Sequence, residues 1–181
     1  GGRVIKLDGN ENPYGCSPRV REALASYTYH NIYPDPEQRE LRKALGEYLR
    51  LSPQSIVAGS GSDELIDLVL RLFLEPGDRV INCVPTFGMY SFSTGVCGGE
   101  VVEVARADFV IDVDRVKRAV DARTKIIFVA SPNNPSGNTT PQDQILEMAG
   151  IGPLVVVDEA YAEFSGTTTI PLVADHPNLI V

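Results

Sequence analysis

The stretch that decides the fold is KIIFVASPNNPSG at residues 125–137. An apolar run fills its first half without alternating, and an Asn- and Pro-rich turn follows at once. Continuous apolar runs of this length are typical of strands that are covered on both faces. A second segment, LVVVDEAY at residues 154–161, has the same design but ends in a carboxylate. Two such segments predict a buried, largely parallel sheet with polar groups at the carboxyl ends of its strands.

A repeated sequence pattern extends outward from these two segments over the chain beyond Pro53. Short β-rich runs alternate with apolar patterns of helical period, which is typical of an α/β protein. The predicted strands are residues 56–58, 80–84, 101–104, 125–130, 154–158 and 179–181. The predicted helices are residues 63–74, 87–96, 113–120 and 141–149. The fold class is therefore α/β, a largely parallel sheet with flanking helices.

The first 35 residues have a different composition, rich in Gly, Asn, Pro and Tyr. We expect one short helix there, capped by Ser17 with Pro18 in its first turn. A longer amphipathic helix should follow, capped by Asp35 and starting at Pro36. The predicted organisation is an arm over residues 1–35 and part of a larger domain over residues 36–181.

Composition and charge limit the function classes. The chain has 181 residues, of which 43% are hydrophobic and 22% charged, and its net charge is -8. An acidic chain is a poor ligand for nucleic acid, and the apolar runs are too short to cross a bilayer. Three cysteines without a C-x-x-C pair and the lack of a visible secretion signal favour reduced thiols and a cytoplasmic location.

The turn before the predicted 63–74 helix, Gly-Ser-Gly-Ser-Asp-Glu at residues 59–64, allows two interpretations. Glycines and a helix start with unpaired N–H groups suit a phosphate. Asp63 and Glu64 also favour a helix start, so a capped helix after a tight turn is the alternative. The segment is neither a Walker A loop nor a complete G-x-G-x-x-G fingerprint.

Three other strand ends carry side chains with similar ambiguity. Phe87, which follows the 80–84 strand, could stack on a planar ligand or could join Tyr90 on the core face of the next helix. Asn133 and Asn134 could position an amide donor or could simply shape a loop. Asp158 closes an apolar strand and needs a cation, because an unpaired buried carboxylate is costly. A Walker B role with Mg²⁺ would need the missing Walker A loop, so no metal site is predicted; the other interpretation places Asp158 against a protonated cofactor ring.

Taken together, these strand ends resemble the cofactor-binding half of fold-type I pyridoxal phosphate enzymes, within the aminotransferase class I/II family. The resemblance is strongest to the histidinol-phosphate aminotransferases. Its motifs follow the family's order over nearly the whole chain, and the Glu-Asn-Pro-Tyr-Gly opening is the most specific of them. The motifs that carry the resemblance are residues 8–15, 33–35, 59–64, 85–90, 131–137 and 158–161.

The resemblance implies a role for several residues toward the cofactor, pyridoxal 5'-phosphate. Asp158 would pair with the pyridine nitrogen and keep it protonated, which makes the ring a better electron sink. Asn134 and Tyr161 would bind the phenolate oxygen of the ring. The amides of Ser62 and Asp63 would hold the phosphate, and Phe87, a Tyr in many relatives, would stack on the ring.

Other implied roles depend on a homodimer. Tyr33 resembles a tyrosine that reaches the phosphate of the neighbouring subunit, and Asn12 and Tyr14 resemble parts of a shared substrate entrance. The partners would be an amino donor and a phosphorylated acceptor, as in the transamination between histidinol phosphate and 2-oxoglutarate in histidine biosynthesis. Another aminotransferase or a related decarboxylase is an alternative.

The lysine that forms the Schiff base in this family is not matched here. The resemblance places it in a Ser-x-Lys segment downstream of Val181, so no catalytic residue is assigned within the chain. We therefore expect a piece of a longer enzyme, inactive by itself. A non-catalytic remnant that binds phosphate ligands or a partner chain is the alternative.

Overall fold

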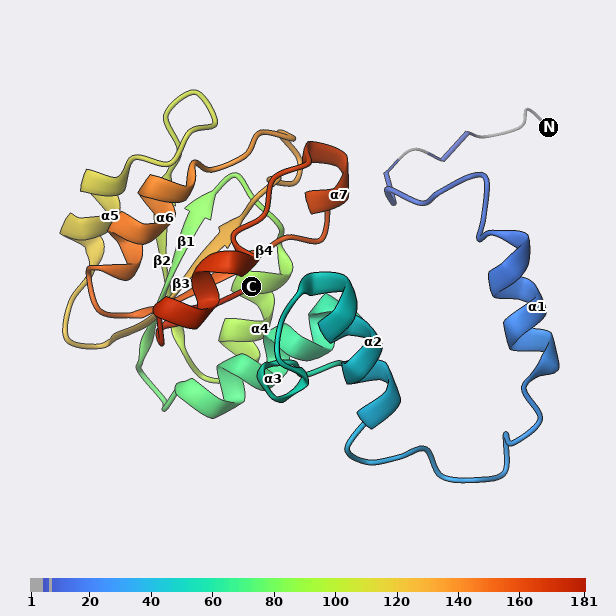
Figure 1. The fold of residues 1–181 in the computed structure, drawn as a ribbon. Coiled ribbons are helices and arrows are strands. Elements are labelled where there is room, and N and C mark those ends of the chain that lie inside the picture. Colours follow the sequence, from blue (N-terminus) through green and yellow to red (C-terminus); the bar gives the residue numbers. More distant parts are fainter. Residues whose placement is uncertain (1–4, 7) are drawn as a thin grey trace. The chain divides into compact units, whose positions relative to one another are not determined.

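The computed structural model describes residues 5, 6 and 8–181; residues 1–4 and 7 of the predicted arm lie outside the described residues (Figure 1). The chain divides into two compact units, one up to Glu40 and one from Leu41, whereas the sequence suggested a boundary after residue 35. The first unit contains α1 (Pro18–Ser26), whose start is capped by the Ser17 side chain as predicted. None of the α1 residues is buried.

The next helix, α2, begins later than its sequence pattern suggested. It spans Arg39–Leu49 rather than starting at Pro36. Gln38 has a φ of 53°, in the left-handed region, so a right-handed helix cannot run through it. Asp35 still acts as a cap, because its carboxylate accepts the amides of Glu37 and Arg39, each at 3.1 Å.

The second unit is built on a parallel five-stranded sheet, which confirms the predicted fold class. Its strands stand in the order β2-β1-β3-β4-β5. They are β1 (Arg79–Val84), β2 (Glu100–Ala105), β3 (Thr124–Ala130), β4 (Leu154–Asp158) and β5 (Leu179–Ile180). The predicted strand at residues 56–58 is wrong: it follows a 3-10 turn, η1 (Pro53–Ser55), and pairs with no strand in the described part of the chain.

Helices join the strands close to the expected positions. They are α3 (Ser62–Phe73), α4 (Met89–Val96), α5 (Val113–Ala119) and α6 (Gln142–Ala149). A short helix, α7 (Ala162–Ser165), and a 3-10 segment, η2 (Ile170–Asp175), were not predicted, because elements this short carry too little periodicity to be recognised.

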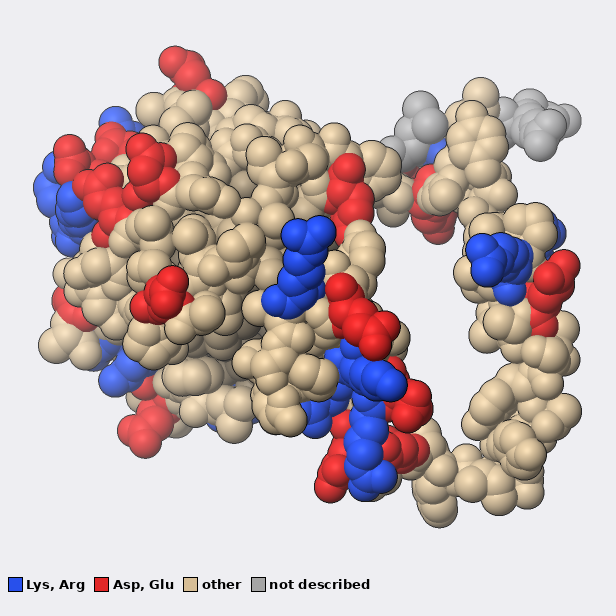
Figure 2. Space-filling view, viewed as in Figure 1, with Lys and Arg blue, Asp and Glu red and all other residues tan. Residues whose placement is uncertain are grey.

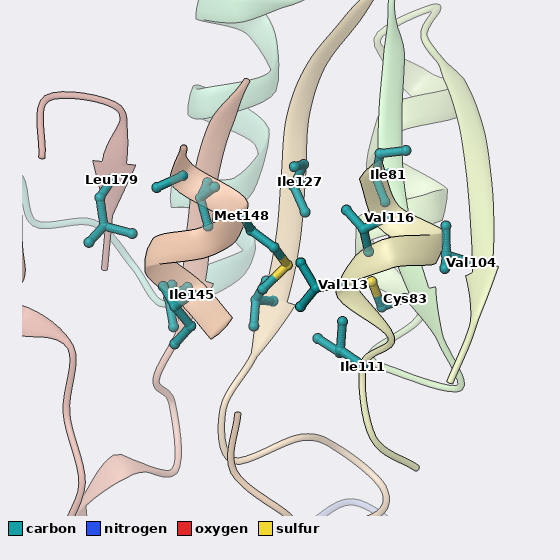
Figure 3. Close-up of a cluster of buried hydrophobic side chains, with 14 residues drawn as sticks. Ile81, Cys83, Val104, Ile111, Val113, Val116, Ile127, Ile145, Met148 and Leu179 are labelled. Atoms are coloured by element: carbon teal, nitrogen blue, oxygen red, sulfur yellow. The ribbon is translucent and has the colours of Figure 1, made fainter. Parts of the chain in front are cut away.

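Two apolar cores lie on opposite faces of the sheet, because side chains alternate along each strand. One core lies under α5 and α6 and contains Ile81, Ile127 and Val155 from the sheet. Figure 3 shows Met148 of α6 and Val113 of α5 pointing into it. The other core lies under α3 and α4, and its members are Ile66, Leu70, Val80, Tyr90, Ile126, Phe128, Ala130, Leu154 and Val156.

The strand order explains which helices cover which face. The chain passes from β1 to β2 on one side, then crosses back over β1 to reach β3. Crossovers between parallel strands are right-handed, so α4 and α5 lie on opposite faces. The reversal leaves a crevice between the carboxyl ends of β1 and β3, which is where such sheets bind ligands. The parallel pairing of Ala130 with Asp158 brings the end of β4 to the same edge.

Candidate active site

A cavity of about 240 Å³ lies at this carboxyl edge. Six of the seven residues predicted to bind the cofactor line it, from four different segments of the chain. They are Ser62, Asp63, Phe87, Asn134, Asp158 and Tyr161. Ser60, Gly61, Tyr90, Ala130, Pro132 and Ala160 complete the lining. The fold thus brings together residues that stand as much as 101 positions apart in the sequence, from Ser60 to Tyr161.

The start of α3 forms one end of the cavity and is open. Gly61 stands at the N-cap with a φ of 94°, which favours glycine, and no side chain caps the helix. The Glu64 carboxylate accepts the amide of Ser60 instead. In the described part of the chain, the amides of Ser62 and Asp63 have no hydrogen-bond partner. Unpaired amides at the positive end of a helix dipole form a site for an anion such as a phosphate.

Asp158, at the end of β4, also lines the cavity. Its Oδ1 accepts the amide of Ala160 at 3.0 Å, and its Oδ2 accepts the hydroxyl of Tyr90 at 2.6 Å. No Lys, Arg or His nitrogen of the described residues makes an ion pair with this half-buried carboxylate. A carboxylate held in place without a cation is suited to pair with a cationic ligand atom.

Tyr90 is the site residue that sequence reasoning missed. Its spacing of three from Phe87 indicated the core face of a helix, and its ring is indeed buried, with 1% exposure. The ring stacks on Phe128 with centroids 4.6 Å apart, and it meets the edge of Phe87 at 5.6 Å. Desolvation, together with the Asp158 charge and hydrogen bond, raises the pKa of Tyr90, so its hydroxyl stays a donor. The available signal was the hydroxyl itself, because a buried tyrosine usually finds a hydrogen-bond partner for its polar end.

Phe87, Asn134 and Tyr161 are all partly exposed, as cavity-lining groups should be. The Asn134 side-chain amide has no hydrogen-bond partner among the described residues, so it is free to bind a ligand. Phe87 offers an aromatic surface. The cavity lining thus combines an aromatic ring, an amide and a carboxylate with the uncapped start of α3.

The remaining predicted residues belong to the N-terminal unit. Tyr14 and Tyr33 are 94% and 98% exposed. The Asn12 Oδ1 accepts the amide of Tyr14 at 3.0 Å within a local turn, which gives Asn12 a structural task of its own. The roles assigned to these three residues stay predictions.

The chemistry of the lining suits a small, planar, anionic ligand with a cationic ring atom. The described lining contains no Lys, Arg or His. No group of three or more potential metal ligands occurs among the residues that the structure describes. On the face shown in Figure 2, Lys and Arg side chains lie among Asp and Glu side chains, without a broad basic surface. None of the helices in the described ranges has the length and apolarity to cross a membrane.

Comparison with known proteins agrees with this geometry. Residues 2–181 match the family Aminotransferase class I and II. Histidinol-phosphate aminotransferase of Dehalococcoides mccartyi strain CBDB1 is 47% identical over 179 residues, which are 98% of this chain and 50% of that protein. The chloroplastic histidinol-phosphate aminotransferase of Nicotiana tabacum is 48% identical over 181 residues, 98% of this chain and 44% of that protein. The chain thus spans about half the length of the curated relatives it matches.

Solved structures show the same likeness. The crystal structure of histidinol-phosphate aminotransferase from Sinorhizobium meliloti in complex with pyridoxal-5'-phosphate matches with a TM-score of 0.87 and 30% identity. The match covers 94% of this chain and 49% of that one. An aspartate aminotransferase of Thermus thermophilus with maleate matches with a TM-score of 0.66 and 34% identity, over 76% of this chain and 39% of that one. The chain therefore belongs to the class I and II aminotransferases and has the fold of pyridoxal phosphate enzymes of fold type I.

Proposed function

We propose that this chain is the cofactor-binding part of a pyridoxal-phosphate-dependent aminotransferase that exchanges an amino group between histidinol phosphate and 2-oxoglutarate in histidine biosynthesis. The observation that carries the proposal is the convergence of six predicted cofactor-binding residues on one cavity at the sheet edge. The names of the relatives support the substrate.

The residues present fit the proposed cofactor. Ser62 and Asp63 offer free amides to its phosphate, and Asp158 offers an uncompensated carboxylate to its ring nitrogen. Phe87 and Asn134 would bind the ring face and the phenolate oxygen, with Tyr161 beside them. When bound, pyridoxal phosphate supplies an electron sink for the carbanion that forms during transamination. The carboxylate of Asp158 would hold a proton on the ring nitrogen, and Tyr90 would hold Asp158.

Assembly and location form part of the same proposal. Tyr14 and Tyr33 lie exposed in a unit whose helix α1 buries none of its residues. A partner subunit would give these side chains a surface to bind, and a two-fold homodimer is the commonest way to supply one. Cys16, Cys83 and Cys97 are free thiols, which supports a cytoplasmic setting. The lysine that the chemistry needs is expected outside residues 1–181.

The test uses the full-length protein that contains residues 1–181. We expect pyridoxal phosphate to bind, and glutamate to form from 2-oxoglutarate when histidinol phosphate is the amino donor. Aspartate, alanine and phosphothreonine serve as competing substrates, each measured by kcat/KM. Binding of the cofactor with a clear preference for one of those three would replace the proposed substrate. A protein that binds inorganic phosphate but never pyridoxal phosphate would leave only the phosphate-binding alternative.

A further inference from the structure

A buried arginine, Arg106, binds Asn133, the neighbour of the cavity-lining Asn134. Arg106 follows β2 directly and is only 9% exposed. No carboxylate of the described residues forms an ion pair with it. Burial lowers the pKa of this guanidinium, which means that the fold works against its charge. Burying a cation without a counter-charge costs free energy. The hydrogen bonds of Arg106 should therefore show which part of the structure it stabilises.

Those hydrogen bonds join three segments of the sheet edge. The Arg106 Nε donates to the carbonyl of Cys83 in β1 at 2.8 Å. Its Nη2 donates to the Oδ1 of Asn133, in the loop after β3, at 3.1 Å. Its Nη1 donates to the carbonyl of Phe109 at 3.3 Å. A planar guanidinium presents donors from three nitrogens in fixed directions, whereas a lysine presents all its donors from one nitrogen.

Asn133 is the centre of this network and is 2% exposed. Its Oδ1 also accepts the hydroxyl of Thr86 at 2.7 Å. Its Nδ2 donates to the carbonyl of Pro85 at 3.1 Å and to the hydroxyl of Ser136 at 2.7 Å. All four hydrogen-bonding positions of the amide are therefore used. Such fully satisfied buried networks fix one arrangement of the segments they connect.

The connected loops are the ones that carry two walls of the cavity. Thr86 precedes Phe87, and Asn133 precedes Asn134. Phe87 and Asn134 line the cavity, while their neighbours point into the network. The spacing between the aromatic surface and the free amide thus depends on bonds that meet at Asn133 and Arg106.

We propose that Arg106 is a positioning residue, which through Asn133 locks the loop of Asn134 against the loop of Phe87 and so sets the width of the cofactor cavity. This inference rests on the proposed function for its ligand, but the locking of the two loops can be measured without any ligand. Arg106 does not line the cavity, so it is a positioning residue and not a catalytic one.

The first experiment measures hydrogen–deuterium exchange in the cofactor-free, full-length protein. Arg106→Met should speed amide exchange at least tenfold in residues 86–88 and 133–137, since both loops lose their common anchor. Arg79→Met is the matched control: Arg79 also joins several segments, through Glu100 and Asp121, but at the amino end of β1. It should leave exchange in the two loops unchanged. Equal exchange in the two variants would overturn the proposal.

The second experiment measures pyridoxal phosphate binding by absorbance and by visible circular dichroism of the bound cofactor. Arg106→Met and Asn133→Ala should each raise the dissociation constant about tenfold. The double variant should have a dissociation constant no higher than that of the weaker-binding single variant, because both substitutions remove the same connection between the loops. Arg79→Met should change it less than twofold. Independent, multiplicative effects or an unaltered dichroism band would contradict a shared positioning role.

A third variant guards against misfolding. Arg106→Lys keeps the positive charge and a long side chain, so it should fold. Its single nitrogen replaces the three that bind Cys83, Phe109 and Asn133, so the loops should still be loosened. Wild-type exchange in Arg106→Lys would overturn the proposal even if Arg106→Met fails to fold. If the wild-type protein binds no pyridoxal phosphate, the proposed function fails, while the exchange data still decide whether Arg106 locks the loops.

Discussion

The two faces of the sheet are built for different tasks. The core under α5 and α6 consists of aliphatic side chains with Cys83 and Met148, and none of its buried members is aromatic. The core under α3 and α4 contains Tyr90 and Phe128, and the Tyr90 hydroxyl leaves the core to reach Asp158. One face supplies packing alone, whereas the other connects its packing to the site. A perturbation on the second face should therefore reach the chemistry, and one on the first should not.

The largest effect is expected at Asp158, where the second face meets the proposed cofactor site. Asp158→Asn in the full-length enzyme should lower kcat about 10³-fold, or about 4 kcal/mol, because a neutral amide cannot hold a proton on the ring nitrogen. Cofactor binding should persist in part, through the start of α3. Asp114→Asn on α5, with an exposed carboxylate, should leave kcat unchanged. Turnover near the wild-type value in Asp158→Asn would remove Asp158 from the mechanism.

A pair of core truncations compares the faces directly. Phe128→Ala and Met148→Ala each delete a fully buried side chain, so each should lower the free energy of unfolding by about 3 kcal/mol. Only Phe128→Ala should also weaken cofactor binding, because it removes the ring against which Tyr90 stacks. Denaturant titration gives the stabilities, and absorbance gives the cofactor affinity at a denaturant concentration where both variants are folded. Equal losses of affinity would mean that the two faces are not separate.

The contrast between the faces also shows what the sequence could reveal. Long apolar runs ending at Ala130 and Asp158 predicted the sheet and the edge at which the cavity lies, since buried parallel strands leave a strong local pattern. The run at residues 56–58 has a similar composition but joins none of the strands among the described residues, because strand pairing is not a local property. Apolar periodicity placed Tyr90 correctly in the core. Because it treats Tyr90 only as a core residue, it could not predict that the hydroxyl binds Asp158. Arg106 gave no sequence signal, because its burial depends on loops from three strands.

A pH effect on stability is expected from the packing face. Burial raises the pKa of the Cys83 thiol from 9.0 to about 11, so the folded protein binds this proton more tightly than the unfolded chain does. Its contribution to stability is complete below pH 9 and is lost as the pH rises toward 11. Between pH 9 and pH 11 the wild type should therefore lose about 2 kcal/mol of unfolding free energy relative to Cys83→Ala, which has no thiol at this position. The same difference for Met148→Ala, which removes no titratable group from the same core, should stay constant, and a constant difference for Cys83→Ala would contradict the burial effect.

The smallest effect concerns the single bond that joins core and site. Tyr90→Phe keeps the stacking on Phe128 and the edge contact with Phe87 but removes the hydroxyl that donates to Asp158. The loss of one hydrogen bond should lower stability by about 1 kcal/mol. Because the amide of Ala160 still holds the other carboxylate oxygen, kcat should fall only severalfold.

Tyr48→Phe is the matched control, since its hydroxyl meets Glu163 at 3.5 Å on the exposed surface, and it should change neither quantity. The raised pKa of Tyr90 keeps its hydroxyl protonated in the neutral range, so Tyr90→Phe should leave the alkaline limb of the pH–rate profile in place. A hundredfold loss of kcat, or a displaced alkaline limb, would make Tyr90 a proton-transferring group. An unchanged kcat would show that Asp158 is held without help from the core, and the link between this face and the cavity would then consist of the lining side chains of Phe87, Tyr90 and Ala130.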